Sequence, residues 1–141
     1  MSELLLLIHD SGLSSALRAS RWAYPLVNAG HILGIAVLFG AVLPLDLRLL
    51  GVWRSVPLDN LQRVLVPTAF AGLGLAVVTG ALLFAVSPAK YAGLPLFQVK
   101  LGLVLASLLN IAFIRGALAG AASILLWVSI VICGRMIAYV V

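Results

Sequence analysis

The sequence predicts an all-α membrane protein, an antiparallel bundle of four transmembrane helices preceded by a short N-terminal interfacial helix. Two observations support this fold class. First, 64% of the 141 residues are hydrophobic, only 9% are charged and the mean hydropathy is +1.23, whereas a soluble domain carries about 25% charged residues. Second, the apolar residues gather in four stretches near the length of about 20 residues that spans a bilayer. Together these observations exclude a soluble globular protein, a disordered chain, collagen and a coiled coil.

The four apolar stretches define the predicted spans, and residues 1–141 are expected to form a single transmembrane domain. The spans cover residues 22–43, 64–86, 96–114 and 117–141. Helices are expected because a helix satisfies its own backbone polar groups in lipid, and no stretch alternates apolar with polar residues as a membrane barrel does. Short connections make consecutive helices antiparallel. We expect Pro67 in the first turns of the second helix, where a missing N–H matters least.

A short helix is expected before the first span. Asp10 or Ser11 can cap its start, and Leu13 and Leu17 then lie on one face. Such a helix is expected to lie along the membrane interface. Farther upstream, Glu3 stands where a signal peptide has positive charge, so we expect no cleaved targeting segment.

The longest connection, residues 44–63, holds charged residues of both signs. Asp46 and Arg48 near its start are expected to form an interfacial ion pair of little energetic value. Residues 87–95 are rich in turn formers and predict a loop. A tight turn is expected at residues 115–116, between the third and fourth spans.

The positive charges outside the spans indicate the orientation. Three lie on the side of both termini: Arg18, Arg21 and Lys90. Four lie on the opposite side: Arg48, Arg54, Arg63 and Arg115. By the positive-inside rule, the 44–63 connection is then cytoplasmic and the termini face the outside. The net charge of +5 is typical of contact with lipid head groups, and no basic stripe with interleaved aromatic residues indicates a nucleic-acid partner.

Small residues recur at four-residue spacing, which lets helix backbones approach closely in lipid. Three such series occur: Gly30 and Gly34; Gly72, Ala76 and Gly80; Gly116 and Gly120. We interpret them as packing within the chain, with a homodimer seam as the alternative. The sequence is therefore also compatible with a homo-oligomer or a larger membrane complex in the bilayer.

Three ionisable residues lie inside the predicted spans, where such residues are costly and mark a functional site by default. They are His31, Lys100 and Arg135, and their depths place all three in the half of the bundle that holds the termini. Asn28 and Tyr139 share helical faces with His31 and Arg135. No acidic residue lies in a predicted span, so we expect the neutralising anion to be a ligand.

Each of these residues also has a purely structural interpretation. His31 can hydrogen-bond a neighbouring carbonyl, and the long side chains of Lys100 and Arg135 can reach the membrane interface. Cys133 and Met136 offer too few sulfur ligands for a copper(I) site. Three further polar residues are expected to form hydrogen bonds between helices: Thr79, Ser107 and Asn110.

Several enzyme classes are excluded because their motifs are missing from the sequence. It has no acidic pair for glycoside chemistry and no nucleophile–histidine–carboxylate set. It also lacks an HExxH zinc motif and a phosphate-binding glycine loop. With four acidic residues in all, a carboxylate relay for ion-coupled transport is not expected.

A neutral imidazole flanked by cations suits a b-type haem, whose iron takes an axial histidine and whose propionates pair with cations. In this hypothesis His31 is the metal ligand and Lys100 and Arg135 bind the propionates. Asn28 or Tyr139 supports the site. The function is then electron transfer or porphyrin-related redox chemistry in the membrane.

The second axial ligand and two other functions stay open at this point. Met136, Tyr139 or a residue of another chain is a candidate for the sixth position of the iron. One alternative function is a non-catalytic accessory or scaffold subunit whose cations bind lipid phosphate or an acidic partner. The other is a quinone or anion pocket that uses the same cations and needs no iron.

Two stretches of the sequence carry a resemblance to a known family. Residues 22–34, WAYPLVNAGHILG, and residues 44–51, PLDLRLLG, resemble a family of small four-helix bacterial membrane proteins of unknown function. The likeness covers nearly the whole chain. It implies a multi-pass protein of the bacterial inner membrane, with termini in the periplasm if the positive-inside rule holds.

More distantly, the layout is similar to the HemJ-type protoporphyrinogen oxidases and to copper resistance protein D. In the HemJ type, a first-helix histidine and a lysine opening the third helix are implicated in haem b binding; His31 and Lys100 match them. Residues 67–80 resemble its second helix. A downstream histidine of that family is Asn110 here, so the resemblance implies haem binding more than porphyrinogen oxidation. The Met/His-rich ligands of the copper family are missing from this sequence.

Overall fold

The computed structural model describes residues 2–113 and 116–140, and every element in this part of the chain is a helix. In chain order these helices are α1 (Ser2–His9), α2 (Gly12–Ala19), α3 (Ala23–Leu49), α4 (Leu58–Val86), α5 (Pro88–Ala92), α6 (Pro95–Phe113) and α7 (Gly116–Val140). The prediction of an all-α fold is therefore confirmed.

Three of the helices, α3, α4 and α7, are long and apolar enough to cross a membrane, and they indicate a multi-pass membrane protein. α6 is also apolar but shorter, over residues Pro95–Ile111. Many large apolar side chains on these four helices are exposed. They are suited to contact with lipid tails, which are themselves apolar. Three predicted positions at span ends or turns lie outside the described residues: Ile114, Arg115 and Val141.

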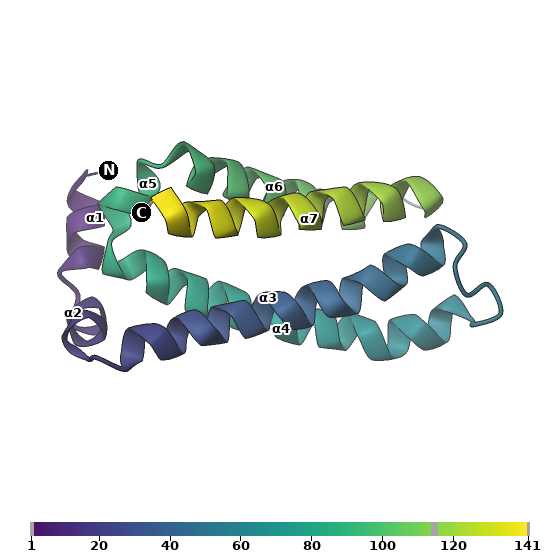
Figure 1. Ribbon diagram of the computed structural model, residues 1–141, viewed down its shortest axis with the longest axis horizontal. Helices are drawn as coiled ribbons and strands as arrows, with labels where there is room; N and C mark the ends of the chain where they lie inside the picture. Colours follow the sequence, from purple (N-terminus) through teal and green to yellow (C-terminus); the bar gives the residue numbers. More distant parts are fainter. Residues whose placement is uncertain (1, 114–115, 141) are drawn as a thin grey trace.

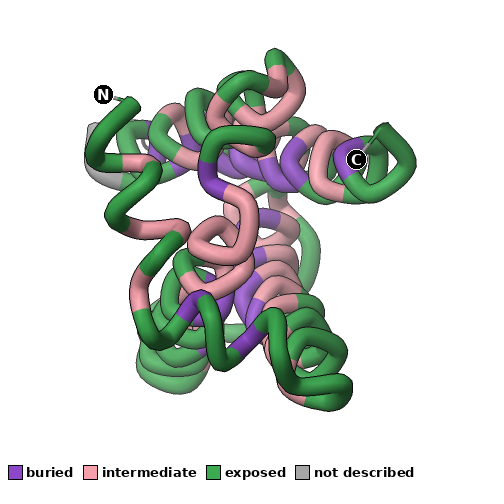
Figure 2. The backbone as a smooth tube through the Cα atoms, turned by 90° about the vertical axis from the view of Figure 1, so that its left-hand side faces the viewer, coloured by how far each residue is buried: buried purple, intermediate pink, exposed green. Residues whose placement is uncertain are grey.

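The four long helices lie as two antiparallel pairs (Figure 1). α3 packs along α4, α6 packs along α7, and α3 and α7 join the two pairs. Figure 2 shows the pairs as two layers, and buried residues lie both between the layers and between α3 and α4. The described residues nearest both termini lie at one end of the molecule, together with α1, α2 and α5 (Figure 1). We refer to this end as the terminal end.

α3 and α4 extend beyond the predicted spans into the 44–63 connection. α3 continues through Pro44 to Leu49, and α4 begins at Leu58, so the connecting loop shrinks to residues 50–57. Pro67 therefore lies in the interior of α4, and its expected place in the first turns of that helix is wrong. The added turns of α3 and α4 carry charged residues, so the apolar stretches of the sequence do not include them. An interior proline such as Pro67 is tolerated in a membrane-spanning helix, because neighbouring groups satisfy the freed backbone carbonyl.

The N-terminal segment forms two short helices, α1 and α2, where the sequence predicted one. Ser11 caps α2, accepting a hydrogen bond from the backbone of Ser14. Leu17 is buried whereas Leu13 is exposed, so the two do not share a buried face. The segment is fastened to the end of α4, because Ser14 Oγ donates to the carbonyl of Ala85 over 2.7 Å.

Arg18 completes this attachment of α2 to α4. Its guanidinium donates to Ser14 Oγ at 2.7 Å and to the carbonyl of Val86 at 3.3 Å, and also to the carbonyl of His9. The last carbonyls of a helix have no partner within the helix and carry a partial negative charge. Ser14 and Arg18 therefore satisfy the exposed carbonyl end of α4.

Aromatic side chains connect the helices at the terminal end. The phenol oxygens of Tyr24 and Tyr91 are 3.5 Å apart, and the ring of Phe97 stacks on that of Phe84 with centroids 5.5 Å apart. Burial, together with the neighbouring hydroxyl of Tyr24, raises the pKa of Tyr91 to about 12. The Tyr91 phenol is therefore neutral at physiological pH and serves as a hydrogen-bonding group.

Glycines bring the backbones of α3 and α4 into direct contact. A Cβ atom on Gly34 would lie 2.6 Å from the backbone nitrogen of Ala76, and one on Gly72 would lie 2.5 Å from that of Leu38. Gly120 of α7 meets the carbonyl oxygen of Asp46 in the same way, at 2.7 Å. At these positions the prediction of small-residue packing within the chain is confirmed.

Replacing Gly72 by alanine is expected to destabilise the protein by about 1–3 kcal/mol, because overpacking a tight contact forces the two helices apart. Gly74 lies two residues along the same helix, and a Cβ atom on it would have no neighbouring atom within 4 Å, so Gly74→Ala is the matched control. Thermal unfolding in detergent measures both. Equal losses of stability in the two variants would contradict the packing we describe.

Candidate functional site

His31 lies in the terminal half of α3 and is held by α4. Its Nδ1 atom is 2.9 Å from the carbonyl oxygen of Ala76 and 3.2 Å from Oγ1 of Thr79. A carbonyl oxygen can only accept, so Nδ1 carries a proton and donates it. In the neutral ring, Nε2 is then the atom with the free lone pair.

The hydroxyl of Thr79 fixes this arrangement from the side of α4. It donates its own hydrogen to the carbonyl of Leu75 over 2.6 Å, which leaves its oxygen available to accept from His31. Thr79 is 7% exposed, so these bonds form away from water. The predicted hydrogen bond between helices at Thr79 is confirmed.

Glycine makes room for the imidazole between α3 and α4. A Cβ atom on Gly80 would lie 3.1 Å from Cε1 of His31. On the opposite helix, a Cβ on Gly30 would lie 3.2 Å from the methyl group of Thr79. The ring therefore lies close against the backbone of α4, and a Cβ atom at position 80 would press on it.

Lys100 approaches the same site from α6. Its side chain is partly buried and lies close enough to act electrostatically on the imidazole of His31. Its Nζ is 3.5 Å from the position of a Cβ on Gly134 of α7, and the thiol of Cys133 is also within electrostatic range. His31, held against α4, and Lys100, held against α7, therefore lie within electrostatic range of each other, and we name them the His31–Lys100 site.

The other predicted ligands lie on exposed helix surfaces or at their edges. Met136 and Tyr139 are exposed, at 47% and 74%. The guanidinium of Arg135 donates to the Tyr139 hydroxyl at 3.4 Å and lies 5.0 Å from the centre of its ring. Asn28 and Arg135 are exposed as well. Among the described residues, the structure therefore joins His31 and Lys100 and turns this group of four outward.

The expected ion pair between Asp46 and Arg48 is wrong. Asp46 is 6% exposed and its carboxyl faces Ser123 of α7, while Arg48 Nε donates to the carbonyl of Val56 at 2.8 Å. Residues two apart on a helix point to different faces. A buried carboxyl inside α3 is the feature that the sequence reasoning missed. The spacing in the sequence could have revealed this burial. Asp46 follows Leu38 and Val42 at four-residue intervals, which places it on the same face of α3, and both of those residues are buried.

The polar residues of α6 differ in their roles. Asn110 Nδ2 donates to the carbonyl of Ala119 on α7 over 3.0 Å, which confirms the predicted contact between helices. Ser107 instead donates to the carbonyl of Leu103 in its own helix, so the prediction for Ser107 is wrong. A serine hydroxyl reaches the carbonyl four residues earlier without any partner helix.

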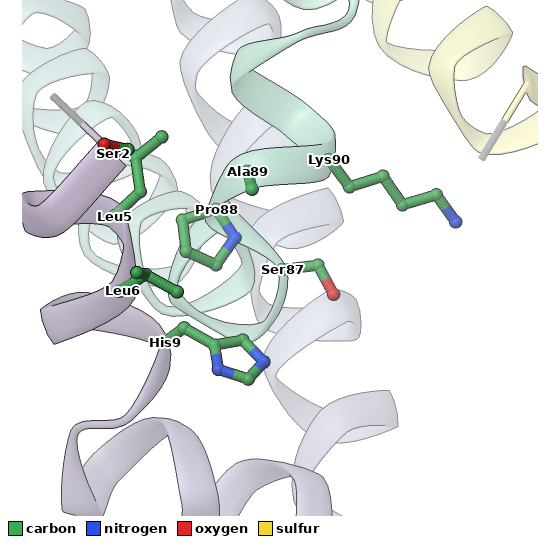
Figure 3. Close-up of a pocket in the computed structure, with 8 residues that line it drawn as sticks. All are labelled: Ser2, Leu5, Leu6, His9, Ser87, Pro88, Ala89 and Lys90. Carbon is green, nitrogen blue, oxygen red and sulfur yellow. The ribbon is translucent and has the colours of Figure 1, made fainter.

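A surface pocket of about 460 Å³ lies at the terminal end, between α1 and α5. Figure 3 shows Pro88 facing Leu5 and Leu6 of α1 across it, with His9 at one edge and Lys90 directed away. Its lining shares no residue with the His31–Lys100 site. No group of three or more His, Cys, Asp or Glu side chains suited to a metal ion occurs among the described residues.

Comparison with protein-family models, with curated proteins and with solved structures finds no match for this chain. The resemblance of residues 22–34 and 44–51 to four-helix bacterial membrane proteins therefore stays a prediction.

The tautomer of His31 is directly testable. At about pH 8, where an imidazole of ordinary pKa is neutral, nitrogen NMR of histidine-labelled protein is expected to show a proton on Nδ1 of His31. His9→Ala assigns the signal, because it removes the other histidine of the chain. A proton on Nε2 instead would contradict the hydrogen bond to Ala76.

Proposed function

We propose that this protein is a four-span membrane protein that binds a b-type haem through His31 and serves electron transfer or porphyrin-related redox chemistry. The observation that carries the proposal is the hydrogen bond from Nδ1 of His31 to the carbonyl of Ala76. Histidines that bind metals commonly donate their second ring nitrogen to such an oxygen, which fixes the tautomer and the ring orientation. Nε2 is then the free lone pair that haem iron requires.

The fit of the remaining residues to haem is uneven. Lys100 supplies a partly buried cation beside the imidazole, as a propionate requires. Arg135, Met136 and Tyr139 face outward, so within one chain His31 alone would be available to hold a haem iron. A second axial ligand from Met136 or Tyr139 requires a neighbouring copy or a larger membrane complex.

The membrane arrangement in this proposal has four spans. α6 runs antiparallel to α7 along its length, and a chain with four crossings has both termini on one side, as the terminal end suggests (Figure 1). The lipid bilayer is then the principal partner, and the membrane is the bacterial inner membrane with the 50–57 loop toward the cytoplasm.

Bound haem would supply a one-electron redox centre. The chain itself contributes three things. Ala76 and Thr79 hold the imidazole and its proton at Nδ1, Gly80 lets the ring lie close to α4, and Lys100 provides positive charge. Positive charge near the cofactor favours its more negatively charged, reduced form, so Lys100 would also affect the redox potential.

Binding of a quinone or another lipid-soluble anion is the second candidate function. Lys100 favours it, because no carboxylate of the described residues forms an ion pair with its ammonium group. A cation in an apolar environment needs an anionic or hydrogen-bonding partner. The same site would then bind its ligand without iron, with His31 as a hydrogen-bonding group.

Absorption spectroscopy tests the haem proposal. Detergent-purified protein is expected to show a Soret band and a pyridine haemochrome, and His31→Ala is expected to lose both because the iron loses its ligand. His9→Ala is the matched control and is expected to keep them, since His9 lies in α1 and pairs with Asp10. A colourless wild-type protein after haem supplementation would rule out haem and leave the quinone or accessory interpretation.

Substitution of the two candidate propionate partners separates their roles. Lys100→Gln is expected to weaken haem binding roughly tenfold or more, because a charge-assisted hydrogen bond contributes about 1.5–3 kcal/mol. Arg135→Gln is expected to change it by less than about fivefold, since an exposed ionic contact contributes at most about 1 kcal/mol. Haem titration measures both, and a larger effect of Arg135→Gln would contradict our assignment.

A further inference from the structure

A second polar region lies inside the helices, toward the end opposite the termini. Asp46 of α3 is 6% exposed, Asn110 of α6 is 4% exposed and Ser123 of α7 is 2% exposed. Each has a side-chain oxygen without a hydrogen-bond partner among the described residues: Asp46 Oδ2, Asn110 Oδ1 and Ser123 Oγ. Such unsatisfied buried groups are few in native proteins and each needs an explanation.

Contacts with one face of α7 connect these three side chains. Ser123 faces the carboxyl of Asp46, and Gly120, one turn before Ser123, lets the backbones of α7 and α3 touch at the Asp46 carbonyl. Asn110 donates to the carbonyl of Ala119, which lies four residues before Ser123 on the same face. Asp46 and Ser123 therefore face each other where α3 meets α7, and Asn110 of α6 contacts α7 one turn before Ser123.

The hydroxyl of Ser123 behaves differently from the other described serine and threonine hydroxyls of the long helices. Thr68, Thr79, Ser107 and Ser129 each donate to the carbonyl four residues earlier in their own helix. For Ser123 that carbonyl belongs to Ala119, which already accepts from Asn110. The amide of Asn110 thus takes the usual partner of Ser123 and leaves its hydroxyl available to another ligand.

We propose that Asp46, Asn110 and Ser123 bind a monovalent cation, Na⁺, through their side-chain oxygens. An unpaired carboxylate inside an apolar protein needs a counter-charge, and no ion pair joins Asp46 to a basic residue in the described part of the chain. One carboxylate neutralises one positive charge, whereas a divalent ion would leave an excess charge in a medium of low polarity.

A cation explains the three oxygens better than a proton or a water molecule. A proton on Asp46 can bond to the facing hydroxyl of Ser123, but it supplies no partner for Asn110 Oδ1. A water molecule can bridge them but does not neutralise a carboxylate. An ion between them supplies both the bridge and the charge. The assignment is independent of the His31–Lys100 site.

The test uses thermal unfolding of the full-length chain in detergent. Replacing choline chloride by NaCl at equal ionic strength and pH is expected to raise Tm in a saturable manner, because a ligand that binds only the folded state stabilises it. Asp46→Asn and Ser123→Ala are expected to abolish most of this rise. Asp59→Asn and Ser129→Ala are the matched controls and keep it, since Asp59 is exposed and Ser129 bonds to Leu125.

Equilibrium binding of radiolabelled Na⁺ to the purified protein provides the second measurement. The wild type and both control variants are expected to bind Na⁺ at one saturable site, and Ser123→Ala is expected to bind it less tightly. This measurement also covers the case in which Asp46→Asn does not fold. The proposal is overturned if the wild type binds no Na⁺ and its Tm is the same in both salts, as a permanently protonated Asp46 or trapped water would give.

Discussion

The backbone contact between α3 and α4 is the constraint on which the fold and the candidate site both depend. Gly34 and Gly72 allow it, because a side chain at either position would overlap the opposite main chain. Ala76 lies at the centre of the contact: its nitrogen packs against Gly34 and its carbonyl oxygen accepts the proton of His31. Helices that pack in lipid lack a hydrophobic driving force and rely on such close contacts. The orientation of the imidazole thus follows directly from helix packing.

α3 is also the helix that links the two pairs, and this gives the molecule two polar regions. At the terminal end, His31 on α3 lies within electrostatic range of Lys100, which belongs to the other pair. At the opposite end, Asp46 on α3 meets Ser123 and Gly120 on α7. Between them lies the apolar core of Leu38, Val42, Trp127 and Ile130. The two regions are therefore separated by packed side chains.

The sequence predicted the features that depend on composition and periodicity. Apolar stretches identified the long helices, and four-residue spacing identified Gly34, Gly72 and Gly120 as contact positions. The sequence did not predict the last turns of α3 around Asp46. Charged residues lower the hydropathy of these turns, although they pack against α7. The depth of a residue along a helix also does not predict whether its side chain points into the protein or toward the lipid. Lys100 and Arg135 have similar depths, yet α6 turns one inward and α7 turns the other outward.

Separation decides whether the two polar regions neutralise each other. His31 and Asp46 are fifteen positions apart on one helix, or about 22 Å at 1.5 Å per residue. Two unit charges that far apart interact by only about 0.8 kcal/mol at an effective dielectric constant of about 20. Removing an ion from water costs several kcal/mol even after relaxation. The attraction is too weak to offset that cost, so the charge in one region does not neutralise the charge in the other. The proposed anion beside Lys100 and the proposed Na⁺ beside Asp46 would therefore bind independently of each other.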